Sequence, residues 1–285
     1  MTPTTMQTTN TATSDRSTIA KLLNKVPEVT LYFWIIKILA TTVGETAADF
    51  LNTTLNLGLN GTTVVMSGLL AVVLFFQFGL KRYVPGVYWL AVVLISVVGT
   101  LITDNMVDNF GISLRASTTI FAVALLATFG VWFAIERTLS IHTISTRKRE
   151  AFYWLAVLFT FALGTAAGDL VAEGLSLGYW KSALMFGALI AAVTSAHYFL
   201  KLNAVLAFWI AYILTRPLGA SIGDYLSQPS DAGGLALGTT GTSVIFLLVI
   251  AVVVAFLTIT KRDRTERGRL ATADLSKPAI EDSAM

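Results

Sequence analysis

Long apolar stretches follow one another from about residue 31 to residue 260 and are separated by short polar turns. A helix that crosses a bilayer needs about 20 mostly apolar residues. Eight segments meet this requirement, at residues 31–54, 62–81, 87–108, 116–136, 151–174, 181–200, 203–227 and 240–260. The pattern therefore predicts an all-α integral membrane protein with a transmembrane domain over residues 28–260.

The two ends of the chain differ in composition from this apolar region. Residues 1–27 are rich in Thr and Ser and lack the apolar stretch of a signal peptide. Residues 261–285 begin with the basic run KRDRTERGR. Since such compositions do not bury enough apolar surface to fold, we expect a disordered tail at each end.

Lysine and arginine residues predict the orientation, because cytoplasmic loops are enriched in them. They precede the first span and follow the second, fourth, sixth and eighth, whereas the opposite side has only Arg115 and Lys181. Both termini are therefore expected in the cytoplasm.

The chain also contains an internal repeat, which is a direct indicator of architecture. Four segments align without a gap: FWIIKILATTVGETAAD, YWLAVVLISVVGTLITD, YWLAVLFTFALGTAAGD and FWIAYILTRPLGASIGD. Each has an aromatic-Trp pair, a Gly ten residues after the Trp, and an Asp five residues after the Gly. Four matches at identical offsets predict four tandem two-helix repeats, near 31–82, 87–137, 151–200 and 203–260.

All four repeats enter the membrane from the same side, so they are parallel. The simplest assembly is a pseudo-fourfold ring, with the Asp-bearing helices inside and their partners outside. The repeated residues are Trp34, Trp89, Trp154 and Trp209; Gly44, Gly99, Gly164 and Gly219; and Asp49, Asp104, Asp169 and Asp224.

Depth along the helix gives each repeated residue an expected role. The Trp residues fall at the cytoplasmic ends, where Trp is a common interfacial anchor. The Gly residues lie about 15 Å further along, where small side chains allow close helix packing. The Asp residues lie about 22 Å from the Trp. This places them in the outer third of the hydrocarbon core, where carboxylates usually line a pathway, or else at the outer interface, where they would simply be solvated.

Further charged residues accompany the aspartates. Glu45, Asp108 and Glu173 each lie four residues from a repeated Asp, a spacing that stacks two side chains on one helix face. The last repeat has Gln228 where others have Asp108 and Glu173. Two cations also fall within spans, Lys37 and Arg216, which we interpret as internal counter-ions or gating charges. The proline after Arg216 is expected to kink or locally unwind that helix.

The balance of charge limits what this group can be. Seven carboxylates face two cations, and such a cluster cannot stay both dry and fully ionised. It opens to outer water, keeps some carboxyl groups protonated, or binds cations. Carboxylate oxygens suit Mn²⁺, Mg²⁺ or Ca²⁺ better than soft metals, although the sequence does not identify the metal.

Composition excludes several other sites. Cysteine is absent and only two histidines occur, so thiolate sites and histidine-built metal cages are excluded. The pairs Gly168-Asp169 and Gly223-Asp224 resemble an element of intramembrane aspartyl proteases, but that chemistry needs one Asp pair and these belong to a fourfold repeat. We therefore expect no enzyme and no cofactor.

The pattern from Lys37 to Asp49, KILATTVGETAAD, and its three echoes resemble a bacterial family of uncharacterised membrane-anchored repeat proteins. The resemblance covers about residues 28–260 and implies the inner membrane and a repeat architecture, without an established activity. Export of a divalent metal such as manganese would fit the acids.

The sequence is compatible with two functions. The first is a transporter or channel for a small cation with an acid-lined vestibule, coupled to protons if the clustered carboxyl groups titrate together. The second is a membrane scaffold or sensor without transport. The expected partners are the lipid bilayer and a small cation, with no nucleic acid, and the sequence leaves a homo-oligomer open.

Overall fold

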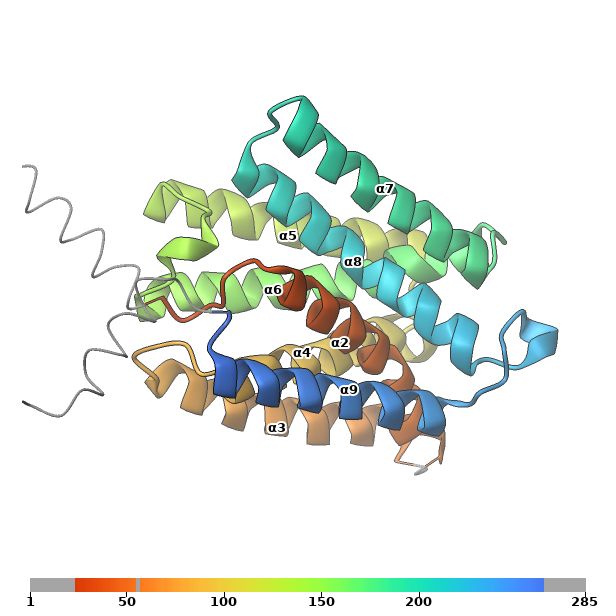
Figure 1. Ribbon diagram of the computed structural model, residues 1–285. Helices are drawn as coiled ribbons and strands as arrows, with labels where there is room; N and C mark the ends of the chain where they lie inside the picture. Colours follow the sequence, from red (N-terminus) through yellow and green to blue (C-terminus); the bar gives the residue numbers. More distant parts are fainter. Residues whose placement is uncertain (1–23, 55–56, 264–285) are drawn as a thin grey trace, which may run out of the picture.

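The computed structural model describes residues 24–54 and 57–263 and is drawn in Figure 1. The described residues form helices and connecting segments, with no β-strand among them. Eight helices are long: α2 (Leu31–Asp49), α3 (Gly58–Gly79), α4 (Pro85–Asp104), α5 (Leu114–Glu136), α6 (Arg147–Asp169), α7 (Tyr179–Phe199), α8 (Ala204–Ser227) and α9 (Thr239–Thr260). Three-residue 3₁₀ turns follow α5 and α8, at Ile141–Thr143 and Ser230–Ala232.

Seven of these helices are long and apolar enough to cross a membrane. The remaining long helix is α2, which carries Lys37 and Glu45 and contacts α4, α8 and α9. The chain therefore has the helical content of a multi-pass membrane protein, and the long helix that is not apolar enough by this measure is packed against three others.

The eight helices form two layers. α2, α4, α6 and α8 make the inner layer, in which α2 contacts α4, α4 contacts α6, α6 contacts α8 and α8 contacts α2. α3 packs on α4, α5 on α6, α7 on α8, and α9 on α2. Each outer helix thus rests mainly on the inner helix of the following repeat, and α9 closes the circle on the first repeat (Figure 1).

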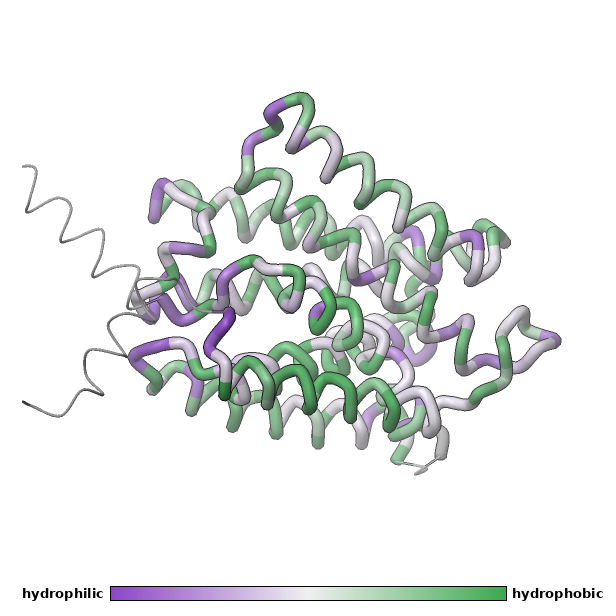
Figure 2. Tube along the Cα trace, viewed as in Figure 1, coloured by the Kyte–Doolittle hydropathy of each residue, from purple (hydrophilic) through white to green (hydrophobic). Residues whose placement is uncertain are grey.

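Burial separates the two layers. The outer helices bury only 17–22% of their apolar windows, whereas α4, α6 and α8 bury 56–78%. Figure 2 shows the outer helices α3 and α9 as mostly hydrophobic along their length. Since an apolar helix surface that stays uncovered is stable in lipid, the outer layer is suited to contact acyl chains.

The repeated glycines lie where neighbouring inner helices touch. A Cβ atom on any of them would overlap a residue of the next inner helix. The pairs are Gly44 with Ser96, Gly99 with Phe161, Gly164 with Arg216, and Gly219 with Thr41. Each partner lies three residues before the glycine of its own repeat, so the four contacts are equivalent by repeat position.

The repeated tryptophans are not the interfacial anchors that the sequence predicted. Trp89, Trp154 and Trp209 are 2–4% exposed, and only Trp34 is partly exposed. The connection between α5 and α6 passes over this end of the bundle, and its Leu139 carbonyl accepts a hydrogen bond from Trp209 Nε1 at 2.9 Å. Because connecting segments cover the end, the indoles fill the core there. We call it the Trp end, and the opposite end of the inner helices the Asp end.

The packed structure extends a few residues into both predicted tails. Lys25 is buried and its Nζ lies 2.6 Å from Glu150 Oε2, while Gln77 Nε2 donates to the other oxygen of that carboxylate at 3.0 Å. At the other terminus, Tyr83 Oη donates to Asp263 Oδ2 at 2.6 Å. Residues 24–27 and 261–263 therefore belong to the packed Trp end. The rest of both predicted tails, residues 1–23 and 264–285, lies outside the described residues.

Replacing an inner glycine should destabilise the bundle. In Gly164→Val the side chain would overlap the stem of Arg216, so we expect a loss of about 1–3 kcal/mol of stability. Thermal unfolding of detergent-solubilised protein measures the effect. Gly130→Val is the matched control, because Gly130 is an exposed residue of α5 with nothing within 4 Å of an added Cβ. Equal melting temperatures for the two variants would contradict the assignment of Gly164 to a tight contact.

Candidate functional site

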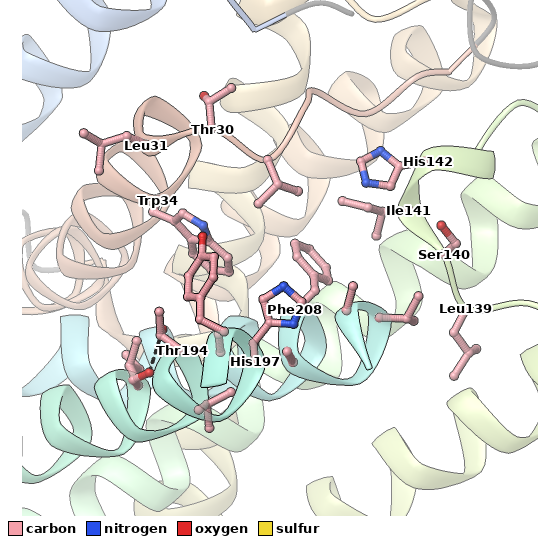
Figure 3. Close-up of a pocket in the computed structure, with 18 residues that line it drawn as sticks. Thr30, Leu31, Trp34, Leu139, Ser140, Ile141, His142, Thr194, His197 and Phe208 are labelled. Atoms are coloured by element: carbon pink, nitrogen blue, oxygen red, sulfur yellow. Dashed lines mark hydrogen bonds between the residues drawn. The ribbon is translucent and has the colours of Figure 1, made fainter. Parts of the chain in front are cut away.

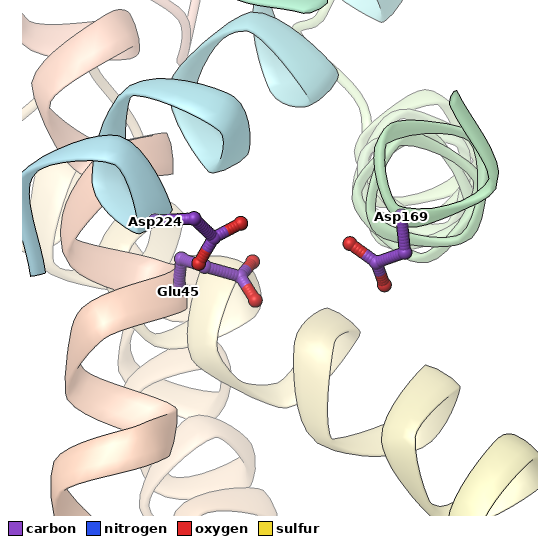
Figure 4. A group of neighbouring side chains, drawn as sticks. All are labelled: Glu45, Asp169 and Asp224. Atoms are coloured by element: carbon purple, nitrogen blue, oxygen red, sulfur yellow. The ribbon is translucent and has the colours of Figure 1, made fainter. Parts of the chain in front are cut away.

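Three carboxylates from different repeats meet near the Asp end. Glu45 comes from α2, Asp169 from the last residue of α6, and Asp224 from α8. One oxygen of each lies within 4.8 Å of an oxygen of the other two. Figure 4 shows Glu45 and Asp224 side by side, with Asp169 extending toward them from α6. We call these residues the acid cluster, and its geometry could hold a metal ion through oxygen ligands.

The two other repeated aspartates lie near the cluster without completing it. Asp49 and Asp104 are partly exposed. Gln228 Nε2 lies 3.5 Å from Asp49 Oδ2, which links the end of α8 to α2. The structure therefore brings the predicted pathway residues to one end, and only three of them within reach of one ion.

Asp108 and Glu173 are more exposed than Asp104 and Asp169, the repeated aspartates four residues before them. Both are exposed, and Glu173 Oε1 accepts a hydrogen bond from Tyr179 Oη at 2.9 Å. The helix type changes in the same region, because π turns at Phe50–Thr54, Asn105–Asn109 and Leu170–Gly174 begin directly after Asp49, Asp104 and Asp169.

Arg216 fills the centre of the inner ring below the acid cluster. Its Nη2 donates to Glu45 Oε2 at 2.9 Å, to Thr165 Oγ1 at 2.6 Å and also to Thr100 Oγ1. Its Nη1 lies 3.4 Å from the Thr41 carbonyl oxygen. Arg216 thus hydrogen-bonds to the inner helix of every other repeat. We call Arg216, Glu45, Thr100 and Thr165 the arginine lock.

The three residues that bind Arg216 in the lock occupy the same position in their repeats. Glu45, Thr100 and Thr165 each directly follow a repeated glycine, and the fourth repeat has Ala220 there. Arg216 is fully buried and Glu45 is 6% exposed. A planar guanidinium with several fixed donors suits such a buried carboxylate and hydroxyl set. The sequence indicated a counter-ion role for Arg216, but the threonines that share it could be found only by comparing this position across repeats.

Pro217 does not unwind α8, contrary to part of the sequence prediction. The helix runs unbroken from Ala204 to Ser227 with the proline inside it. Proline removes one backbone hydrogen bond from a helix. In compensation, Pro217 packs against Gly164 and Gly168 of α6, so tertiary contact holds the segment helical.

Lys37, the second cation within a helix, makes no ion pair in the described structure. It is 1% exposed, and its Nζ has no hydrogen-bond partner among the described residues. The ammonium position lies over two aromatic rings, 4.0 Å from the Phe161 centroid and 4.1 Å from that of Tyr212. Such cation–π contacts offset only part of the cost of leaving water.

Comparison with known families identifies the repeat. One family model matches four consecutive segments, at residues 32–83, 87–138, 152–203 and 207–263. The chain belongs to the family of the Repeat of Unknown Function, DUF347. The four matches confirm the four tandem repeats predicted from the sequence. No curated protein and no solved structure gives a significant match to the chain.

A pocket of about 570 Å³ lies at the Trp end of these DUF347 repeats, away from the acid cluster. The ends of α2, α7 and α8 and the α5–α6 connection form it (Figure 3). Both histidines line it: His197 Nδ1 is 2.8 Å from the Leu202 carbonyl oxygen, and His142 Nδ1 is 3.7 Å from Glu28 Oε2. Since none of the described residues that line it carries a carboxylate, the pocket does not share the chemistry of the Asp end.

Removing one charge of the lock should destabilise the DUF347 bundle strongly. Glu45→Gln leaves the Arg216 guanidinium buried without a counter-charge, which costs about 3–5 kcal/mol in comparable buried pairs. Thermal unfolding in detergent measures it. The double variant Glu45→Gln/Arg216→Met removes both charges and should recover part of the loss. A Glu45→Gln protein as stable as the wild type would show that the lock does not support the fold.

Proposed function

We propose that this protein is a membrane transporter or channel for a small cation, with the acid cluster as its entry site. One observation carries the proposal: three carboxylates converge within the reach of a single ion. Only one of them, Glu45, has a cationic partner in the described structure. Two negative charges stay uncompensated if all three are ionised, which a divalent cation such as Mn²⁺ would balance. Hard oxygen ligands of this kind suit Mn²⁺, Mg²⁺ and Ca²⁺.

The packing supports a pseudo-fourfold arrangement in the bilayer. All eight long helices span the membrane in this proposal, and α2 does so because Lys37 and Glu45 turn toward other inner helices instead of lipid. The equivalent glycine contacts support a common axis through the ring. The excess of Lys and Arg near the Trp end supports a cytoplasmic position for that end and for both termini. The membrane would be the bacterial inner membrane.

The lock closes the axis in the described state, so transport requires it to open. A cation at the acid cluster competes with Arg216 for Glu45, because both bind the same carboxylate. Loss of Glu45 frees the guanidinium from the centre of the ring. Arg216 then no longer donates to Thr100 and Thr165. Their hydroxyl oxygens become available to the ion, one step further from the Asp end.

A non-transporting scaffold or sensor is the second candidate. The observation that favours it is the lock itself, because Arg216 ties all four repeats together. In that case the acids hold the repeats in place, and replacing them should reduce stability without any flux to lose.

Neutralising the aspartates separates the two candidates. We expect Asp104→Asn/Asp169→Asn to abolish Mn²⁺ flux, at least tenfold below wild type. The acid cluster loses one of its three carboxylates and its surroundings lose another negative charge, while the apolar spans still insert. The measurement is dye-reported Mn²⁺ uptake into liposomes, repeated with Mg²⁺, Ca²⁺ and K⁺. Asp231→Asn is the control, since Asp231 is an exposed residue of the α8–α9 connection.

Three results are informative. Flux that is lost only in the double variant supports the transporter. Normal flux in the double variant contradicts the role of the acid cluster. No flux from folded wild-type protein under any gradient, together with a lower melting temperature for the double variant, favours the scaffold.

A further inference from the structure

Lys37 occupies a level of the inner ring that is otherwise uncharged. The residue three positions after the repeated Trp is Lys37 in the first repeat, and Val92, Val157 and Tyr212 in the others. All four are at most 1% exposed. This level lies one helical turn from Arg216 toward the Trp end, at about 6 Å per four residues. The amine is therefore isolated from water and lies directly behind the lock.

The groups that face Lys37 can be named from each neighbouring helix. α8 contributes Tyr212, whose ring centroid lies 4.1 Å from Lys37 Nζ, and Arg216, which shares the Phe161 ring with it. The neighbouring inner helices α6 and α4 carry the buried Tyr153 and Tyr88. α9 has no ionisable residue, and Glu45 follows on α2 itself. The Tyr88 and Tyr153 hydroxyl groups hydrogen-bond to each other one turn nearer the Trp end. Among these groups Glu45 is the one carboxyl group, and Arg216 is already paired with it.

Lys37 and Arg216 share one aromatic face. Phe161 has Lys37 Nζ at 4.0 Å and Arg216 Cζ at 5.9 Å from its ring centroid. Two full positive charges in so dry a place repel each other, and an arginine does not give up its proton in a protein. A lysine amine does so readily when buried. The positive charge at this level can therefore change only at Lys37.

We propose that Lys37 carries the proton that this protein exchanges for its cation, an inference that rests on the proposed transport function. When a cation takes Glu45 from Arg216, the guanidinium loses its counter-charge and repels the Lys37 ammonium more strongly. The N–H bond of the ammonium breaks and the electron pair stays on Nζ. The proton passes toward the Trp end, where the Tyr88 and Tyr153 hydroxyl groups hydrogen-bond to each other, and from there to bulk water. When the cation leaves, Arg216 returns to Glu45 and the amine takes up a proton again.

The first test is coupled flux in liposomes that contain an Mn²⁺ dye and a pH dye. We expect wild-type protein to move protons against Mn²⁺. Lys37→Met, which is always neutral, should keep Mn²⁺ flux down its gradient but lose proton movement at least tenfold. Lys37→Arg, which is always charged, should lose both. Lys81→Met is the control, because Lys81 is an exposed lysine after α3, and it should behave as the wild type.

The second test needs no flux. Mn²⁺ is added to detergent-solubilised protein in weakly buffered solution with a pH indicator. Both proteins should bind Mn²⁺, but the wild type should release one more proton per bound ion than the Lys37→Met variant. If Lys37→Met does not fold, Lys37→Gln replaces it in both tests.

The outcomes separate this inference from the function on which it rests. Mn²⁺ flux with equal proton movement in wild type and Lys37→Met, or equal proton release on binding, overturns the role of Lys37 and leaves the transporter intact. No Mn²⁺ flux and no Mn²⁺ binding by wild-type protein overturns both.

Discussion

The whole structure depends on how one buried guanidinium is satisfied. Arg216 lies at the level where the four inner helices touch, and an unpaired charge there would be prohibitively costly. Glu45 supplies the counter-charge, and Thr100 and Thr165 supply oxygen acceptors from the two remaining repeats. The repeated glycines make this arrangement possible, because they bring the backbones close enough for one side chain to reach three helices.

The same arrangement links stability to chemistry. Glu45 belongs both to the lock and to the acid cluster, so any ion that binds the cluster competes with the bond that closes the ring. Asp169 and Asp224 bring further negative charge to the same place from helices that the lock holds together. In the proposed transporter this competition would open and close the cation pathway, whereas in a scaffold the lock would stay closed.

The two cations buried within the inner helices, Lys37 and Arg216, stand at positions where the other repeats have uncharged residues. Three of four repeats have an uncharged side chain at the level of Lys37, and at the level of Arg216 the others have Thr41, Ser96 and Phe161. If the four repeats were identical, four lysines or four arginines would converge on the axis and repel one another. The chain keeps one cation at each level, and it places both beside the ring of Phe161.

The sequence by itself determined the eight helices, the four repeats, the closely packed glycines and the presence of acids at one end, because each of these leaves a periodic or compositional trace along the chain. Tertiary structure decided the rest. Asp108 and Glu173 lie exposed at the ends of their helices, the α5–α6 connection covers the buried tryptophans, and the packing of α2, α6 and α8 brings Glu45, Asp169 and Asp224 together. The partners in the lock leave only one trace in the sequence, their shared position after a repeated glycine, because distances between helices far apart in the chain are set by packing that no local spacing encodes.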